Sequence, residues 1–402
     1  MSNKKIIIAS FFLFHSFFIY LDDGSGIGRR VQAVFLFLFI LIFNTRIKYI
    51  FKIRNKGVLF SLLFYVISLF ITSILNKSID TSYFLRINIP SVRNEYVSSS
   101  YTLGIMCAIV VFMHFSFVFY LNMIKKTDVL INVFFKLCLV YCIIADLFLI
   151  TGVSITKADT IFSNKFALSY MHLYLVTFFC LKQTLVFQKV KYLYVFLLFA
   201  VVISIYSECT TAVIGCLVLF IVYRYRQYFL HKIFNTKIII LCLAVCALFP
   251  VFVSLIINSP IISYIVVDIL GEDLTLTGRT NIYETFSYVA FLRPLSGFGL
   301  GTGGSVMMFL YGYANAQNGI VELFLEQGVL GVISVLFLLI ACLKVAEQNN
   351  KKIVFPVQAL VLTLIIMSTV EITIDTKFVI FLSLLLITNK ICVKTNNPVL
   401  TY

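Results

Sequence analysis

Charged residues are scarce in this sequence. Asp, Glu, Lys and Arg make up only 12% of the 402 residues, whereas hydrophobic residues make up 61%. A soluble globular chain of this length could not hide so large an apolar fraction in its own core. The composition therefore excludes an ordinary soluble protein and predicts that lipid surrounds most of the chain.

No motif for a metal or a redox centre is present. The ten cysteines are scattered, and none forms a CxxC pair or a Cys/His cluster of zinc spacing. The four histidines do not combine with a carboxylate at metal-ligand spacing. We therefore predict no metal site, and we expect the cysteines to pack as small hydrophobic side chains.

Long apolar runs are the dominant pattern. Runs of roughly 16 to 24 residues recur along the whole chain and are long enough to cross a bilayer as helices. They predict an all-α polytopic integral membrane protein, with about twelve transmembrane helices in a single transmembrane domain over residues 1–402. The predicted spans are 6–21, 31–43, 58–75, 101–124, 129–150, 166–181, 192–206, 210–223, 237–258, 319–342, 353–373 and 378–389.

Acidic residues are outnumbered by basic ones, and the net charge is +15. Such an excess favours nucleic acid only where it forms one patch. Here most basic residues fall on alternate connections and on the termini, as the positive-inside rule requires. We therefore predict cytoplasmic termini and no nucleic-acid partner. The first span is followed by LDDGSGIGRR, which offers no small-residue cleavage site, so it is predicted to be retained.

A few ionisable residues fall within predicted spans, where such groups are functional candidates. Lys136 lies near enough to an inner helix end to snorkel, and Asp146 near enough to an outer end to reach the interface. His114 and His172 are expected to be structural.

Polar residues concentrate late in the chain, in a predicted large extracytoplasmic loop over residues 259–318. A polar segment between two apolar spans is either a site or a connector. The segment 277–331 combines arginines, carboxylates, glycines and amides, which favours a site. Its run GFGLGTGG lacks the preceding strand and lysine of a nucleotide loop. The glycines are instead expected to let the backbone turn tightly and approach a helix or a substrate closely.

Several motifs follow one another in this segment: Gly278-Arg279, the turn Pro294 to Gly301, the segment Ala316 to Gly319, and Glu322, Glu326, Gly328 and Gly331. Their order resembles that of the O-antigen ligase and O-antigen polymerase superfamily. They cover about 55 residues. The turn Ser207 to Ala212 is also similar to the serine-rich turn of that family, and the twelve-helix layout agrees.

The resemblance implies a GT-C-like fold and a reaction on the outer face of the bacterial inner membrane. The expected reaction transfers an undecaprenyl-pyrophosphate-linked oligosaccharide, with no nucleotide sugar, metal or other cofactor. Membrane lipid and a chain-length regulator are further expected partners. The ligases are expected to carry histidine where this chain has Gln317, and glutamine is no general base near neutral pH. The resemblance therefore favours a polymerase that extends O-antigen or a related surface polysaccharide.

Arg279 is the first candidate site residue. A guanidinium can bind a pyrophosphate through two parallel hydrogen bonds and stabilise the negative charge that develops on it as it leaves. The alternative is a solvated loop arginine or one that contacts lipid headgroups. Other expected substrate-binding residues are the arginines Arg293, Arg86 and Arg93, the sugar-stacking Tyr283, and Gln317, Asn318, Gly299 and Gly301.

Glu322 is the candidate catalytic base. It lies four residues before Glu326, on one helix face. Both positions also suit a first helical turn capped by Asn318, which is a structural explanation for the acids. Glu284, Asp273 and Glu272 are rival bases.

Two other functions share the layout. A ligase that moves finished polymer onto lipid A core has the same fold and donor. A lipid-oligosaccharide flippase or secondary transporter also has about twelve spans, but carriers tend to show internal repeats, broken helices and charges at mid-membrane. The concentration of polar residues in one outer loop favours an enzyme.

Overall fold

The computed structural model describes residues 1–18, 27–53, 55–77, 100–151, 165–186, 192–256, 264, 282–283, 286, 290–303, 306–307, 316–349 and 351–388. All regular secondary structure within these ranges is helical. The predicted all-α class is therefore confirmed for the part of the chain described.

Each predicted apolar segment coincides with a helix. The helices are α1 (Asn3–His15), α2 (Ile27–Phe43), α3 (Lys56–Leu75), α5 (Ser100–Met123), α6 (Thr127–Thr151), α7 (Lys165–Val186), α8 (Leu193–Tyr206), α9 (Thr210–Arg224), α11 (Thr236–Ile256), α15 (Gly319–Gln348), α16 (Lys351–Met367) and α17 (Thr376–Leu384). Short helices η1 (Asn44–Lys52), α10 (Arg226–Tyr228) and η3 (Phe229–Ile233) follow α2 and α9.

Five helical segments of the described chain are long and apolar enough to cross a membrane. They are Gly28–Lys52, Lys56–Leu75, Tyr101–Met123, Thr127–Thr151 and Gly319–Gln348. The pair Thr210–Arg224 and Arg226–Ile233, bent by 81°, would make a sixth if it forms one span. These helices support a membrane protein.

Three predicted spans, 6–21, 353–373 and 378–389, extend five or six residues past the ends of their helices, and the second of them bears on the site. The sequence places a span over residues 353–373, but α16 ends at Met367 and the chain then turns until α17 begins at Thr376. The hydroxyl of Ser368 donates to the carbonyl of Ile365, and Thr373 donates back to Leu364, so these side chains bond the last turn of the helix. The acidic residues of this turn consequently lie outside the helix.

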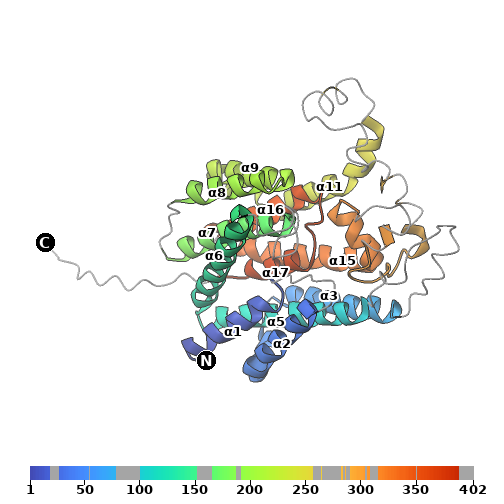
Figure 1. Ribbon diagram of the computed structural model, residues 1–402. Helices are drawn as coiled ribbons and strands as arrows, with labels where there is room; N and C mark the ends of the chain where they lie inside the picture. The colour runs from blue at the N-terminus through green and yellow to red at the C-terminus, as the bar shows by residue number, and fades with distance from the viewer. Residues whose placement is uncertain are drawn as a thin grey trace.

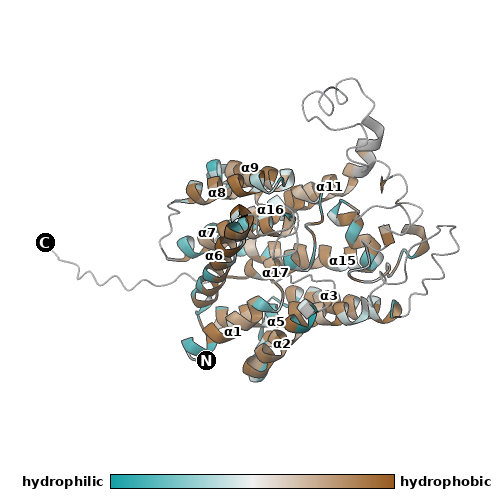
Figure 2. Ribbon diagram, viewed as in Figure 1, coloured by the Kyte–Doolittle hydropathy of each residue, from teal (hydrophilic) through white to brown (hydrophobic). Residues whose placement is uncertain are grey.

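The helices pack as a bundle in which α15 is central. It contacts α3, α11, α16 and α17, while α8 and α9 lie together beside α16 and α7 (Figure 1). Apolar residues line the helices along their length (Figure 2). Because lipid tails are as apolar as these side chains, the helices associate through close packing more than through hydrophobic transfer.

An aromatic cluster illustrates this packing. Phe18, after the end of α1, contacts Phe134 of α6, Phe178 of α7 and Phe381 of α17, with ring centroids 6.1 to 6.2 Å apart. Edge-to-face contacts of this kind contribute roughly 0.5–1.5 kcal/mol each beyond the area they bury. The cluster therefore joins the first and last helices to the middle of the bundle.

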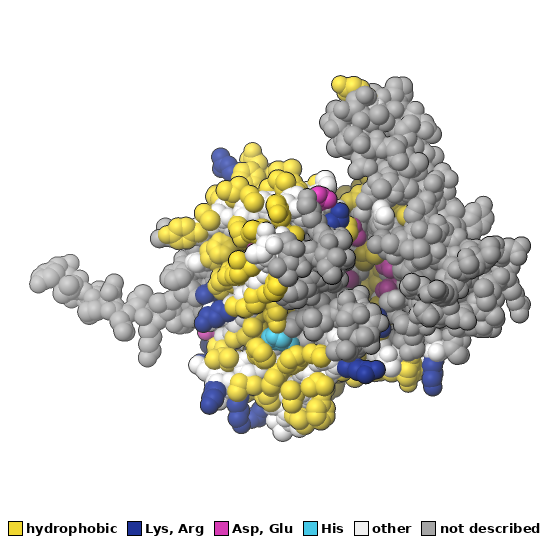
Figure 3. All heavy atoms as spheres, viewed as in Figure 1, with side chains coloured by type: hydrophobic (Ala, Val, Ile, Leu, Met, Phe, Trp, Pro, Cys, Tyr) yellow, Lys and Arg dark blue, Asp and Glu magenta, His cyan; other side chains and the backbone are white. Residues whose placement is uncertain are grey.

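The outer surface of the bundle is apolar. Large hydrophobic side chains such as Phe37, Phe60, Ile150 and Leu198 are more than half exposed. In Figure 3 hydrophobic side chains cover much of the described surface, and acidic side chains are visible in a hollow on the right of the view. An apolar exterior around a polar hollow is the arrangement expected when lipid surrounds the helices.

Candidate functional site

Helix α15 is broken at Gly328. This residue has φ 62° and ψ −163°, which divides the helix into a short segment, 319–327, and a long one, 329–348. A break removes backbone hydrogen bonds that lipid cannot replace, so such breaks occur only where protein or water satisfies the freed groups. The break therefore requires a partner.

The glycine-rich turn at residues 294–301 is that partner. Four backbone hydrogen bonds join it to the break: Phe298 N–H to Leu325 O (2.7 Å), Gly299 N–H to Glu326 O (2.8 Å), Val329 N–H to Pro294 O (2.8 Å) and Leu330 N–H to Leu295 O (3.3 Å). The turn therefore supplies hydrogen-bond partners for the backbone groups that the break leaves free, and the break does the same for the turn.

Two glycines make this contact possible. Gly297 has φ 60°, and a β-carbon there would lie 2.5 Å from the backbone nitrogen of Gln327. A β-carbon at Gly328 would overlap the carbonyl group of Leu295. The sequence-based prediction that the glycines allow a tight turn and a close approach to a helix is confirmed.

Glu322 and Glu326 lie on one face of the short segment, as predicted from their spacing. Glu326 Oε1 accepts a hydrogen bond from the N–H of Gly301 (2.7 Å), and Glu322 Oε2 accepts one from the N–H of Ala316 (3.2 Å). Each carboxylate therefore holds backbone that belongs to the predicted extracytoplasmic loop.

Asn318 caps the short segment, which confirms the structural role expected for it. Its side-chain oxygen accepts hydrogen bonds from the N–H groups of Ile320 and Val321, both 3.0 Å long. Its amide nitrogen donates to the carbonyl of Thr369 at 3.2 Å. The side chain is fully buried, so its amide orients the start of α15 against the turn that follows α16.

That turn brings further acidic residues to the same place. Glu371 is only 7% exposed, and Asp375 caps α17 by accepting a hydrogen bond from the N–H of Phe378 at 3.0 Å. Burial raises the pKa of Asp375 above its ordinary value, while the neighbouring charge of Lys377 acts to lower it. Desolvation thus favours the protonated acid at this position.

These groups line one cavity of about 450 Å³. Its charged lining residues are the carboxylates Glu322, Glu326, Glu371 and Asp375 and the cations Arg29 and Lys377. Aromatic and apolar side chains from α3, α5 and α7, and Phe17 after the end of α1, contribute to the walls. Its size matches pockets for small ligands, roughly 300–1,000 Å³. Carboxylates in such walls can accept protons and bind hydroxyl groups.

The lining residues share one more property. Most of them come from the end of α1, the starts of α2, α5, α7, α15 and α17, the glycine-rich turn and the turn after α16, while Tyr65 and Val335 lie farther along α3 and α15. The positive-inside pattern predicts that all of these helix ends lie on the extracytoplasmic side. The fold therefore gathers segments that the topology prediction places on one side of the membrane.

The other candidate residues lie apart from this cavity or outside the described part of the chain. Tyr283 is buried in a small apolar cluster against the short segment of α15, with its hydroxyl 3.2 Å from the carbonyl of Gln317. Arg293 donates to the side chain of Asn76 at the end of α3. Arg279, Arg86, Arg93, Glu284, Asp273 and Glu272 lie outside the described residues.

Of the two glycines predicted to bind substrate, Gly301 lines the cavity, and Gly299 is used in the bond to α15. Sequence reasoning missed Arg29, Glu371, Asp375 and Lys377. Three of these, Glu371, Asp375 and Lys377, lie where the predicted span 353–373 ends and the span 378–389 begins. That spacing of charges in an outer connection is the signal that could have identified them.

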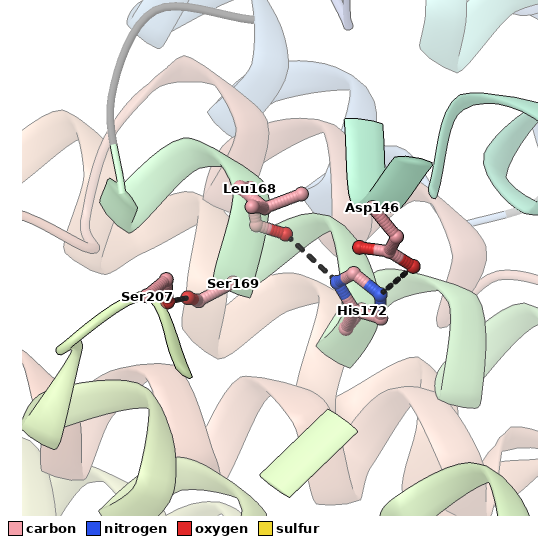
Figure 4. A network of polar contacts seen from close by, with 5 residues as sticks. All are labelled: Asp146, Leu168, Ser169, His172 and Ser207. Atoms are coloured by element: carbon pink, nitrogen blue, oxygen red, sulfur yellow. Dashed lines mark hydrogen bonds and ion pairs between the residues drawn. The ribbon is translucent and has the colours of Figure 1, made fainter. Parts of the chain in front are cut away.

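A second polar cluster joins α6, α7 and the serine-rich turn (Figure 4). Asp146 Oδ2 lies 3.2 Å from His172 Nε2, while the hydroxyls of Ser169 and Ser207 lie 3.1 Å apart. Asp146 is 4% exposed and faces His172 of the adjacent helix, so its carboxylate is buried within the bundle. His172 is buried and bonded, as expected of a structural histidine.

No group of three or more His, Cys, Asp and Glu side chains within the described ranges is placed to hold a metal ion, although four carboxylates line the cavity. Compared with protein-family models and with curated protein sequences, the chain matches none. The likeness to the O-antigen superfamily accordingly rests on the motif residues quoted above.

Proposed function

We propose that the protein is a glycosyltransferase that polymerises undecaprenyl-pyrophosphate-linked oligosaccharide units of O-antigen or a related surface polysaccharide. In this proposal about twelve helices cross the bacterial inner membrane, both termini are cytoplasmic, and residues 259–318 form an extracytoplasmic loop. The observation that carries the proposal is the carboxylate-lined cavity, which adjoins the glycine-rich turn of the family-like motif.

The cavity offers the groups that this reaction needs. The hydroxyl of the acceptor sugar attacks the anomeric carbon of the donor as the bond from that carbon to the pyrophosphate oxygen breaks. The hydroxyl proton passes to a carboxylate, for which Glu322 is our candidate, and the pyrophosphate departs on its lipid. Arg279 is the proposed partner of the pyrophosphate charge.

The polymerase is favoured over the ligase by one residue. Gln317 occupies the position at which the ligases are expected to carry a histidine that activates the acceptor. An uncharged amide cannot take a proton near neutral pH. In the proposed reaction the base must come from elsewhere, and the nearby cavity carboxylates supply it.

Deleting the gene tests the proposal, because a polymerase, a ligase and a carrier leave different products. Loss of a polymerase should leave lipid A core capped by a single repeat unit, which electrophoresis of the surface polysaccharide resolves as a collapsed ladder. Complementation with wild type should restore the ladder. Uncapped core with accumulated long polymer would instead indicate a ligase.

A carrier is the second candidate, and two structural observations favour it. Broken helices and buried ionisable groups are common in carriers, and the structure contains both, at Gly328 and at the Asp146–His172 pair. The same deletion strain separates the two functions. Loss of a carrier should trap repeat units on the cytoplasmic face of the membrane.

A further inference from the structure

Arg29 places a cation in the cavity wall. It lies in the first turn of α2, and Gly28 and Gln32 of that helix line the cavity with it. Residues three or four apart share a helix face, whereas adjacent residues point about 100° apart. Arg30 is not among the lining residues, although it is also exposed. The helix thus presents one of two neighbouring arginines to the site.

The charge of Arg29 is not neutralised by the described side chains. The other cation of the cavity, Lys377, interacts electrostatically with Asp375. Arg29, in contrast, forms no hydrogen bond and no ion pair within 4.0 Å with any residue in the described ranges. Within the described ranges, therefore, no side chain occupies the donors of its guanidinium.

The surroundings of Arg29 suit an amphiphilic anion. Phe17, Leu103, Met106 and Val110 provide an apolar wall in the same cavity. A guanidinium binds phosphate oxygens through two parallel hydrogen bonds, and it also offsets the repulsion that the cavity carboxylates exert on an anion. The first turn of a helix adds to the positive potential.

We propose that Arg29 binds a phosphate group of the lipid-linked donor at the mouth of the cavity. This inference rests on the proposed function and adds a donor-binding residue to it. The chemistry shared by all candidate ligands is a phosphate on a lipid. A membrane phospholipid headgroup carries the same group, so the test must distinguish the two sources.

The first test measures binding in detergent with farnesyl pyrophosphate as the probe. We expect Arg29→Gln to bind it roughly 10 to 100 times more weakly than wild type, since a charge-assisted hydrogen-bonded contact is lost. Arg29→Lys should be intermediate, because it keeps the charge without the planar fork. Arg30→Gln is the matched control and should bind like wild type. Equal affinity of Arg29→Gln and Arg30→Gln would overturn the inference.

The second test measures polymerisation by the purified protein. Arg29→Gln should raise the KM for the lipid-linked donor by a similar factor and leave kcat near that of Arg30→Gln. If wild type polymerises and the two variants have the same KM, the inference is wrong and the proposed function stands. If wild type forms no polymer from the donor, the proposed function itself fails.

The third test separates the donor from a membrane headgroup. Thermal stability is compared in phosphatidylcholine nanodiscs with and without phosphatidylglycerol. We expect the anionic lipid to stabilise wild type, Arg29→Gln and Arg30→Gln equally. If Arg29→Gln lost only the stabilisation by phosphatidylglycerol and kept its affinity for farnesyl pyrophosphate, the residue would be a headgroup contact, contrary to the inference.

Discussion

Replacing Gly328 with alanine should detach the glycine-rich turn from the break in α15. Gly328 has φ 62° and ψ −163°, a conformation almost restricted to glycine that costs another residue roughly 1–3 kcal/mol. The new β-carbon would also overlap the carbonyl group of Leu295. One backbone segment must therefore move away from the other.

The movement weakens the four hydrogen bonds that join residues 294–299 to residues 325–330. A buried backbone group that loses its partner costs about 1–3 kcal/mol, and the bilayer interior offers no water to replace it. Losing two of the four bonds, together with the backbone cost, gives a destabilisation of roughly 3–9 kcal/mol. That is comparable with the whole stability of many domains, about 5–15 kcal/mol.

Unfolding is followed with a maleimide dye that becomes fluorescent when it reacts with cysteines exposed by heating. This probe suits the protein because the chain has no tryptophan and most of the described cysteines are buried. Gly57→Ala is the matched control. Gly57 lies in the first turn of α3, and its new β-carbon would meet only the side-chain oxygen of Asn55, 3.1 Å away. We expect Gly328→Ala to unfold at a clearly lower temperature and to lose polymer synthesis. Equal unfolding temperatures for the two variants would refute this account of the break.

Three further predictions concern the carboxylates and the topology. Glu322→Gln keeps the shape and an oxygen for backbone hydrogen bonding, but it should reduce polymerisation by about 100-fold or more because the proton acceptor is lost; a normal polysaccharide ladder would remove Glu322 as the base. The raised pKa of Asp375 means that the folded state holds its proton more tightly than the unfolded state. Stability should therefore fall as pH rises from the ordinary value of 3.8 through the folded-state pKa. Thermal unfolding across pH should show this slope in wild type and less of it in Asp375→Asn, and equal slopes would contradict the assignment. On a cysteine-depleted background, Leu295→Cys should react with a membrane-impermeant thiol reagent in intact cells and Tyr225→Cys only after permeabilisation, and the reverse pattern would contradict the predicted topology.

The positions of the helices could be predicted because hydrophobicity is a local property. Runs of apolar residues mark all twelve helices that coincide with predicted spans, from α1 to α17. The end of α16 could not be placed in the same way. Val370, Ile372 and Ile374 keep the segment apolar, and they conceal that Glu371 and Asp375 face the cavity. The polar groups of that turn become visible only when the neighbouring helices are in place.

The break in α15 shows a second limit. Glycine within a helix pattern has several explanations, and nothing next to Gly328 distinguishes them. The cause is the turn around Gly297, about thirty residues earlier in the chain, whose backbone pairs with the break. The role of Arg29 could not be predicted from its neighbours in the sequence either. It lines the cavity together with the carboxylates only because α2 packs against α5 in the fold.

The way the break is filled bears on the choice between enzyme and carrier. In carriers, unwound helix carbonyls commonly coordinate a coupling ion inside a cavity. Here the carbonyls of Leu325 and Glu326 already accept hydrogen bonds from Phe298 and Gly299, and the N–H of Val329 is also bonded to the turn. Because these backbone groups are bonded to the glycine-rich turn, the break positions that turn. Contacts with a ligand must then come from side chains. Those side chains are carboxylates that can accept a proton, as the proposed glycosyl transfer requires.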